Sequence, residues 1–148
     1  MSEKKRLQAL YALSGEIHIL VQEMIAKHKN RKNDYGDLFQ SLMAGLDGMA
    51  FRMYICNEDG IQKSPNYVKK ADGWELQPEH RDKNWSWRPY FLENILKMSE
   101  DKKGILSDRY NDIETGATIR TFCLPVESGD YLFIDLESVY LNDREGLY

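Results

Sequence analysis

With 148 residues, 42% of them hydrophobic and 30% charged, the chain has the composition of a single globular domain. Its net charge of −4, with both signs mixed along the chain, argues against nucleic-acid binding, which needs a basic surface. The sequence shows neither an apolar run that would span a membrane nor a signal peptide, so we predict a cytoplasmic protein. The two cysteines, Cys56 and Cys123, are therefore expected to be reduced thiols in the core.

The first predicted element is a helix over residues 6–28. Its apolar residues recur at alternating steps of three and four, which places them along one stripe of the helix: Leu10, Leu13, Ile17, Leu20 and Met24. This is the spacing of a coiled coil, maintained for about two heptads. The stripe either packs on the helix's own domain or forms the seam of a homodimer. The sequence leaves both arrangements open, and we favour the homodimer.

A polar stretch over residues 30–34 separates this helix from a second helical pattern, which runs from Tyr35 to Leu46. The sequence does not determine whether residues 6–46 form one bent helix or two. We assign residues 1–46 to an N-terminal signalling or dimerisation segment. Residues 47–148 are assigned to a second domain.

From Met49 the apolar pattern changes from a helical period to alternation, which predicts a strand over residues 49–56. Met53 and Ile55 lie on one face of this strand, and Arg52 and Tyr54 on the other. An Asp-Gly turn follows, so residues 61–66 are predicted to complete a hairpin. Residues 67–88, which hold all three tryptophans, are predicted to form an irregular loop that folds back on the sheet.

The second half of the chain begins with a predicted helix over residues 89–99, in which Pro89 occupies the first turn. Three strands are predicted after it, over residues 105–110, 117–126 and 131–137. Short strands interleaved with few helices predict an α+β domain. We expect one antiparallel sheet of about five strands, preceded by a long N-terminal helix.

Several short segments resemble Cache domains, which are PAS-like sensor domains. Residues 88–91 (Arg-Pro-Tyr-Phe) resemble the Arg-x-Tyr-Phe segment at the start of the Cache pocket helix. Later residues resemble the rest of the Cache pattern in the same order: Tyr110, Asp112, Gly116, Thr121, Pro125 and the strand 132–136. The resemblance implies a PAS-like fold that binds a ligand.

Within that family, the sequence is most similar to the Cache-like C-terminal domain that follows EAL domains in some Bacillus-type cyclic-di-GMP phosphodiesterases. Residues 83–91 (Lys-Asn-Trp-Ser-Trp-Arg-Pro-Tyr-Phe) carry most of this similarity, which extends over residues 47–137. It implies a signalling partner, an EAL phosphodiesterase in cis or in trans.

The resemblance also implies a ligand pocket made of seven residues: Trp87, Arg88, Tyr90, Tyr110, Asp112, Thr121 and Asp135. A guanidinium such as that of Arg88 matches a ligand carboxylate in two parallel hydrogen bonds. A carboxylate such as that of Asp112 would hold a ligand ammonium. Each has a structural alternative: Arg88 in an internal ion pair with Asp112 or Asp135, and Asp112 as the cap of an Asx turn.

Other residues near the expected pocket have two interpretations as well. Trp85 and Trp87 either line the pocket, where they would cage a cation, or anchor the loop as part of the core. Asp135 needs a partner if it is buried, and Arg52 is the candidate. Arg120 is expected to extend its charge from its strand towards solvent.

No catalytic or metal-binding pattern is present in the sequence, because the three histidines are scattered and no cysteine pair has metal-ligand spacing. We therefore expect a domain that is not an enzyme and carries no cofactor. It would sense a small polar ligand, an amino acid or a carboxylate, and pass the signal to its partner. The alternative is a dimerisation or interaction module whose pocket is filled by its own side chains. An open cavity at Arg88 would favour the sensor.

Overall fold

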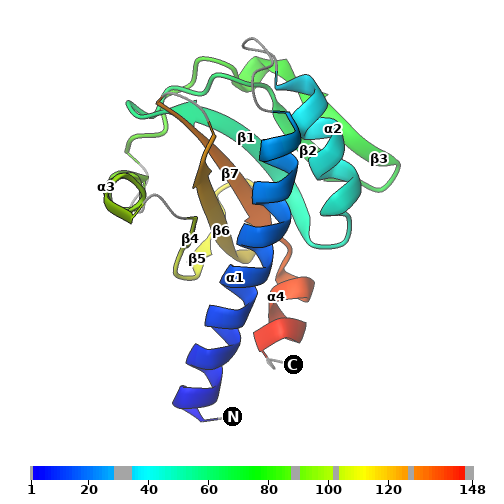
Figure 1. Cartoon of the computed structure of the whole chain (residues 1–148). Coiled ribbons are helices and arrows are strands. Elements are labelled where there is room, and N and C mark those ends of the chain that lie inside the picture. Colours follow the sequence, from blue (N-terminus) through cyan, green and yellow to red (C-terminus); the bar gives the residue numbers. More distant parts are fainter. Residues whose placement is uncertain (1, 29–34, 88–90, 102–103, 127–128, 146–148) are drawn as a thin grey trace.

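The protein, described by a computed structural model over residues 2–28, 35–87, 91–101, 104–126 and 129–145, is built around one antiparallel sheet (Figure 1). In chain order its elements are α1 (Glu3–Lys27), α2 (Gly36–Gly45), β1 (Ala50–Asn57), β2 (Asn66–Lys70), β3 (Gly73–Gln77), the 3-10 helix η1 (Pro78–His80), α3 (Phe91–Asp101), β4 (Ile105–Leu106), β5 (Tyr110–Asn111), β6 (Thr118–Pro125), β7 (Asp130–Leu136) and α4 (Ser138–Glu145).

The sheet has seven strands, with the order β3-β2-β1-β7-β6-β4, and β5 also pairs with β6. Every pairing is antiparallel. The first and last strands of the domain, β1 and β7, therefore lie side by side at its centre. The predicted α+β class and antiparallel sheet are confirmed, with seven strands in place of about five.

The predicted hairpin over residues 49–66 is wrong. Residues 61–65 form no strand, and they contact the sheet region through two isolated bridges, Cys56 to Gln62 and Ile61 to Asn84. Part of the reason is local chemistry: the Ser64 hydroxyl accepts the Ile55 backbone N–H at 2.8 Å, and Pro65 has no N–H to offer a ladder. The strand that pairs with β1 is β2, over residues 66–70.

Two further boundaries differ from the predictions. Residues 66–77, expected to be mostly irregular, form the β2–β3 hairpin, with Gly73 at a φ of +126° beside its turn. The hairpin lies at the sheet edge, where exposed and polar residues blur the alternation that predicts strands. The predicted strand 105–110 is two short strands, β4 and β5. The short helix α4 was not predicted.

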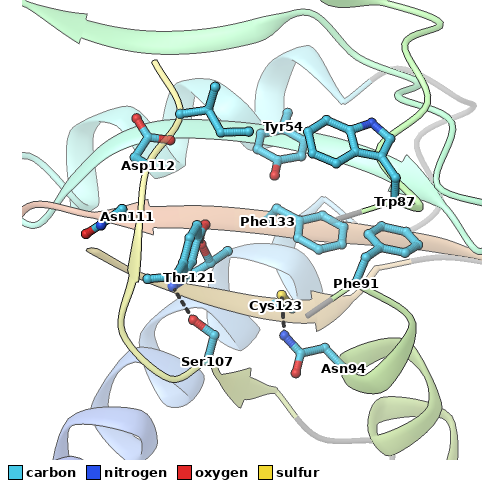
Figure 2. A pocket seen from close by; sticks show the side chains of 12 residues that line it. Tyr54, Trp87, Phe91, Asn94, Ser107, Asn111, Asp112, Thr121, Cys123 and Phe133 are labelled. Carbon is cyan, nitrogen blue, oxygen red and sulfur yellow. Dashed lines mark hydrogen bonds between the residues drawn. The ribbon is translucent and has the colours of Figure 1, made fainter. Parts of the chain in front are cut away.

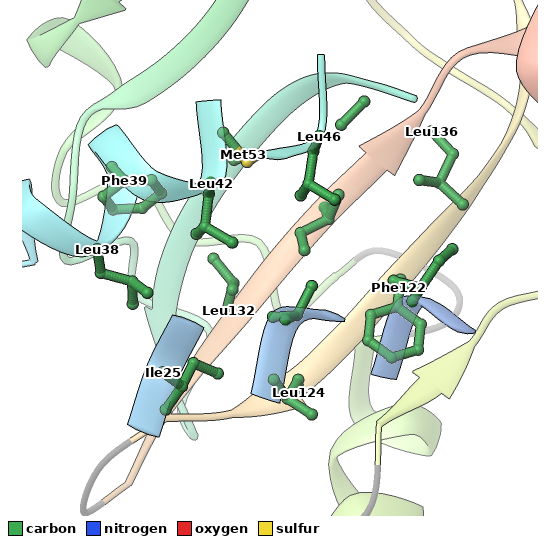
Figure 3. Close-up of a cluster of buried hydrophobic side chains, with 14 of the residues drawn as sticks. Ile25, Leu38, Phe39, Leu42, Leu46, Met53, Phe122, Leu124, Leu132 and Leu136 are labelled. Atoms are coloured by element: carbon green, nitrogen blue, oxygen red, sulfur yellow. The ribbon is translucent and has the colours of Figure 1, made fainter. Parts of the chain in front are cut away.

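One face of the sheet is covered by three helices, α1, α2 and α4, and is called the helix-covered face below (Figure 1). Figure 3 shows the apolar cluster between these helices and the sheet, which includes Phe39, Leu42, Phe122 and Leu132. Residues 1–46 and 47–148 thus contribute to a single hydrophobic cluster. Within the described residues no helix has the length and the hydrophobicity that crossing a membrane requires.

Helix α1 packs on the sheet of its own chain. Leu13 and Ile17, from the centre of the predicted stripe, are fully buried there. The buried line continues with Val21 and Ile25, whereas Leu10, Leu20 and Met24 are half-buried. A homodimer through this helix remains a prediction, but Leu13 and Ile17 are not available to form its seam.

The opposite face of the sheet is covered by α3. Here the buried cluster is aromatic and sulfur-rich, and it comprises Tyr54, Cys56, Phe91, Ile95, Met98, Cys123, Tyr131 and Phe133. Both cysteines are buried free thiols. The alternation predicted for β1 is confirmed, because Met53 and Ile55 face the helices while Tyr54 and Cys56 face α3. This second face contains the candidate site.

Candidate ligand-binding site

A cavity of about 400 Å³ lies between the sheet and α3. This volume falls within the range of about 300–1,000 Å³ that is typical of small-molecule sites. Figure 2 shows that the cavity has two ends. Tyr54, Phe91, Phe133 and Trp87 surround one end, and polar side chains, among them Asp112 and Thr121, surround the other.

The register of the central strands produces these two ends. Arg52, Asp135 and Thr121 lie directly opposite one another on β1, β7 and β6, and form a polar row across the sheet. Two residues along the strands, Tyr54, Phe133 and Cys123 form the next row on the same face. Successive rows on one face are about 7 Å apart, so a small molecule can contact both.

Arg52 is the centre of the polar end. Its Nε donates to Asp135 Oδ2 at 2.7 Å, and its Nη2 donates to Asp112 Oδ1 at 2.5 Å. A third carboxylate, that of Glu114, lies 3.3 Å from Nη1 and is partly exposed. Arg52, Asp112 and Asp135 are all buried, so Arg52 compensates two charges that water does not reach.

The protonation states of these groups follow from their contacts. Burial by itself would lower the pKa of Arg52, but the charge of Asp135 and the hydrogen bond to Asp112 outweigh it and raise that pKa. Burial would raise the pKa of Asp112, but hydrogen bonds from Arg52 and Thr115 outweigh it and hold that pKa below its ordinary value. Both groups are therefore charged at neutral pH.

Thr121 connects this charged cluster to the cavity. Its hydroxyl donates to Asp135 Oδ1 at 2.6 Å and is hydrogen-bonded to the hydroxyl of Tyr110. Tyr110 and Thr121 both line the cavity, whereas Asp135 lies beneath it and is fully buried. Besides the Asp112 carboxylate, a ligand at this end would meet two hydroxyls whose orientation is set by the buried carboxylate of Asp135.

Four of the seven predicted site residues line the cavity: Trp87, Tyr110, Asp112 and Thr121. Asp135 supports the cavity from below, and its pairing with Arg52 is as predicted. Arg88 and Tyr90 lie outside the described residues. Asp112 also adopts its structural alternative, because the Thr115 N–H and hydroxyl both donate to its Oδ2, at 3.0 and 2.8 Å.

Trp85 and Trp87 have different roles in the structure, although their rings contact one another. Trp85 is half-buried, and its indole N–H donates to Gln62 Oε1 at 2.7 Å, so it anchors the loop. Trp87 lines the cavity and remains 59% exposed.

The expectation that Arg120 extends towards solvent is wrong. Arg120 is buried on the helix-covered face, where it donates to Glu145 Oε1 at 3.0 Å and to the Ser107 carbonyl at 2.9 Å. Glu145 also accepts a hydrogen bond from Arg109 at 2.6 Å. The partner was missed because Glu145 belongs to α4, a helix that was not predicted.

Sequence reasoning also missed several lining residues, including Tyr54, Asn94, Cys123 and Phe133. Alternation along β1, β6 and β7 was a usable signal for the strand residues. For Asn94 the signal was its position three residues after Phe91 on the pocket helix. Cys123 is no candidate nucleophile, because burial, together with the charge of Asp135, raises the pKa of its thiol far above neutral pH.

Comparison with known proteins gives the class of the domain. Residues 1–148 match the family described as the EAL-domain associated signalling protein domain, and the chain belongs to this family. It is 43% identical over 146 residues to the uncharacterized EAL-domain containing protein YkuI of Bacillus subtilis (strain 168). The alignment covers 98% of this chain and 36% of that relative, so the chain spans about a third of the relative's length.

Solved structures agree with this assignment. The crystal structure of Bacillus subtilis YkuI, which has an EAL domain and is in complex with its substrate c-di-GMP and calcium, matches 99% of this chain and 37% of its own, at a TM-score of 0.90 and 43% identity. The ligand-binding domain of the Campylobacter jejuni chemoreceptor Tlp3, in complex with 4-methylisoleucine, matches 95% of this chain and 57% of its own, at a TM-score of 0.64 and 13% identity. These matches confirm the predicted resemblance and the Cache-like fold.

Proposed function

We propose that this domain is a non-catalytic sensor whose cavity binds a small amphipathic molecule, an amino acid or a carboxylate. The observation that carries the proposal is the cavity itself, which has an aromatic end and a polar end on a Cache-like fold. A ligand of this kind would place its apolar part against Tyr54 and Phe133 and its polar groups near Tyr110 and Thr121.

The alternative is a module whose pocket is filled by its own side chains. The volume of about 400 Å³ supports the sensor instead, because a self-filled site would leave little space at native packing density. A Tlp3 structure of the same fold class contains isoleucine, which supports a ligand of amino-acid size. Arg88, which immediately follows Trp87 of the cavity wall, is proposed to contact the ligand carboxylate.

We further propose that the signal leaves through α1. The pocket helix α3 is followed by Gly104, whose N–H donates to His18 Nδ1 on α1 at 3.3 Å. A Cβ at Gly104 would collide with the ring of Phe122, so Gly104 itself is packed tightly between α1 and the sheet. A movement of α3 on ligand binding would therefore act on α1 at this point.

The N-terminal part of α1 projects beyond the sheet (Figure 1) and carries the exposed apolar residues Leu7 and Tyr11. We propose that this part of residues 1–46 contacts the partner that receives the signal, which is either a second copy of the chain or an EAL phosphodiesterase in cis or in trans. The cytoplasmic location expected from the sequence belongs to the same proposal.

The decisive experiment is a thermal-shift screen of the chain against free amino acids and small carboxylates. A ligand at about 100 times its dissociation constant should add roughly 2.7 kcal/mol of stability, which is a clear rise in melting temperature. Arg88→Ala should abolish the rise while the unliganded protein keeps its melting temperature. Arg81→Ala, an exposed arginine outside this cavity, is the matched control. A screen in which no member of the panel raises the melting temperature would contradict the proposal.

A further inference from the structure

We propose that the cavity selects a ligand with a planar aromatic ring that carries a hydrogen-bonding atom, as in a phenol or an indole. The inference rests on the proposed ligand-binding function and narrows it from amphipathic molecules in general to aromatic ones. Tyrosine and tryptophan are the simplest members of this class. Three observations at the aromatic end of the cavity carry the inference.

The first observation is a wall of nearly parallel rings. Tyr54 stacks on Phe133 with centroids 5.3 Å apart and planes 5° apart, and Phe91 stacks on Phe133 at 5.5 Å and 15°. All three side chains line the cavity. Any apolar group gains by burial against such a wall, but only another ring also gains the offset-stacked or edge-to-face contact that aromatic pairs prefer.

The second observation is the indole of Trp87. It borders the cavity and yet is 59% exposed, although the indole is the largest apolar side chain. Its ring contact with Trp85 is tilted by 50° with centroids 5.9 Å apart, so that contact leaves much of the ring uncovered. Figure 2 shows Trp87 beside Tyr54 at the aromatic end, where a bound ring would cover it.

The third observation is the carboxamide of Asn94, which lies on α3 three residues after Phe91. Its side chain lines the cavity and is only 7% exposed. Nδ2 points to Cys123 Sγ at 3.9 Å, which is a weak contact because a thiol is a poor acceptor. This contact uses only part of the hydrogen-bonding capacity of the carboxamide, whose oxygen points away from Cys123 in Figure 2.

A side-chain amide in a cavity wall offers a ligand both N–H donors and an oxygen acceptor. Asn94 lies beside Cys123 and on the same side of the cavity as Phe91 (Figure 2). A ring bound there would bring a hydroxyl or ring N–H near the carboxamide. An aliphatic side chain, such as that of isoleucine, would make no hydrogen bond with the carboxamide and gain no ring contact. The geometry therefore favours a polar aromatic ring over an aliphatic group of similar size.

Three amino acids that differ by one feature each test the inference on the whole chain by calorimetric titration. L-Tyrosine has the ring and its hydroxyl, L-phenylalanine has the ring alone, and cyclohexyl-L-alanine has neither the hydroxyl nor the aromaticity. We expect tyrosine to bind at least about tenfold more tightly than phenylalanine, because only tyrosine can form a hydrogen bond with the Asn94 carboxamide through its ring substituent. Phenylalanine should bind several-fold more tightly than cyclohexylalanine.

Two variants assign these differences to residues. Asn94→Leu should remove the preference for tyrosine over phenylalanine, and Trp87→Leu should reduce the preference for phenylalanine over cyclohexylalanine. Leu96→Ala, an exposed change on the same helix, is the control and should leave all three affinities unchanged. The three ligands are compared on the unmodified chain, so the inference is still tested if one of the variants fails to fold.

The possible failures are distinguishable. If isoleucine and cyclohexylalanine bind as tightly as tyrosine, the aromatic selectivity is wrong while the proposed sensing function stands. If tyrosine and phenylalanine bind equally, the role of Asn94 is wrong. If no amino acid or carboxylate binds at all, the proposed function fails together with this inference.

Discussion

The two faces of the sheet are built from alternate residues of the same strands, yet they are filled in different ways. The helix-covered face packs aliphatic side chains such as Leu13, Ile17 and Leu132 with no exposed surface. The other face places aromatic rings and a buried charged cluster around a cavity of about 400 Å³. The neighbouring β1 residues Arg52 and Met53 therefore face opposite sides of the sheet: Met53 belongs to the apolar core and Arg52 to the charged cluster.

The difference shows how a small domain combines stability with a binding site. Close packing on the helix-covered face supplies the burial that holds the fold together. On the other face the polar groups are satisfied mostly by one another, so the cavity can stay open without stranded charges. The hydrogen-bonded series from Tyr110 through Thr121 and Asp135 to Arg52 joins four strands, β5, β6, β7 and β1, and keeps the polar end of the cavity in place.

Among the variants that test the difference between the two faces, Arg52→Met is expected to lower the free energy of unfolding the most. The substitution keeps much of the side-chain volume but leaves Asp112 and Asp135 as buried carboxylates without their cation, which should cost about 3–5 kcal/mol in the free energy of unfolding. Urea denaturation measures the loss. Lys69→Met, which breaks the surface ion pair with Asp47, is the control and should cost less than about 1 kcal/mol. Equal losses for the two variants would refute the structural role of the charged cluster.

A comparable or smaller effect is expected on the helix-covered face from Ile17→Ala. Ile17 is fully buried between α1 and the sheet, so the cavity left behind should cost about 2–5 kcal/mol. Ile19→Ala, two residues away on the exposed side of α1, should change the free energy of unfolding by less than about 0.5 kcal/mol. If chemical denaturation gave the same midpoint for both variants, α1 would not pack on the sheet as described.

The smallest effect concerns acid stability. The pKa of Asp112 is lower in the folded protein than in the unfolded chain, so its contribution to stability is complete above about pH 4 and is lost as the pH falls through the folded pKa. Asp112→Asn should therefore flatten the dependence of the free energy of unfolding on pH below about pH 4. The exposed change Asp108→Asn should not. Parallel pH profiles for Asp112→Asn and the unmodified protein would contradict the charged state of Asp112.

The parts of the site that the sequence predicted were those that the Cache pattern names. Tyr110, Asp112 and Thr121 were placed together by that resemblance, and they do share one end of the cavity. The same pattern contained no information on what else Asp112 contacts. Its ion pair with Arg52 joins residues 60 positions apart, and only the register of the sheet brings them together.

Local patterns in the sequence were enough to determine the class of fold, the alternation of β1, the pocket helix and the two final long strands, because each depends on side-chain periodicity within about ten residues. Tertiary structure alone decided that β1 pairs with β7, that Leu13 and Ile17 face their own sheet, and that Glu145 meets Arg120. These contacts join distant segments, and no short-range pattern distinguishes a stripe that packs on its own domain from one that packs on another chain. The cavity was likewise decided by the tertiary structure alone, because it is the space left between elements after they pack.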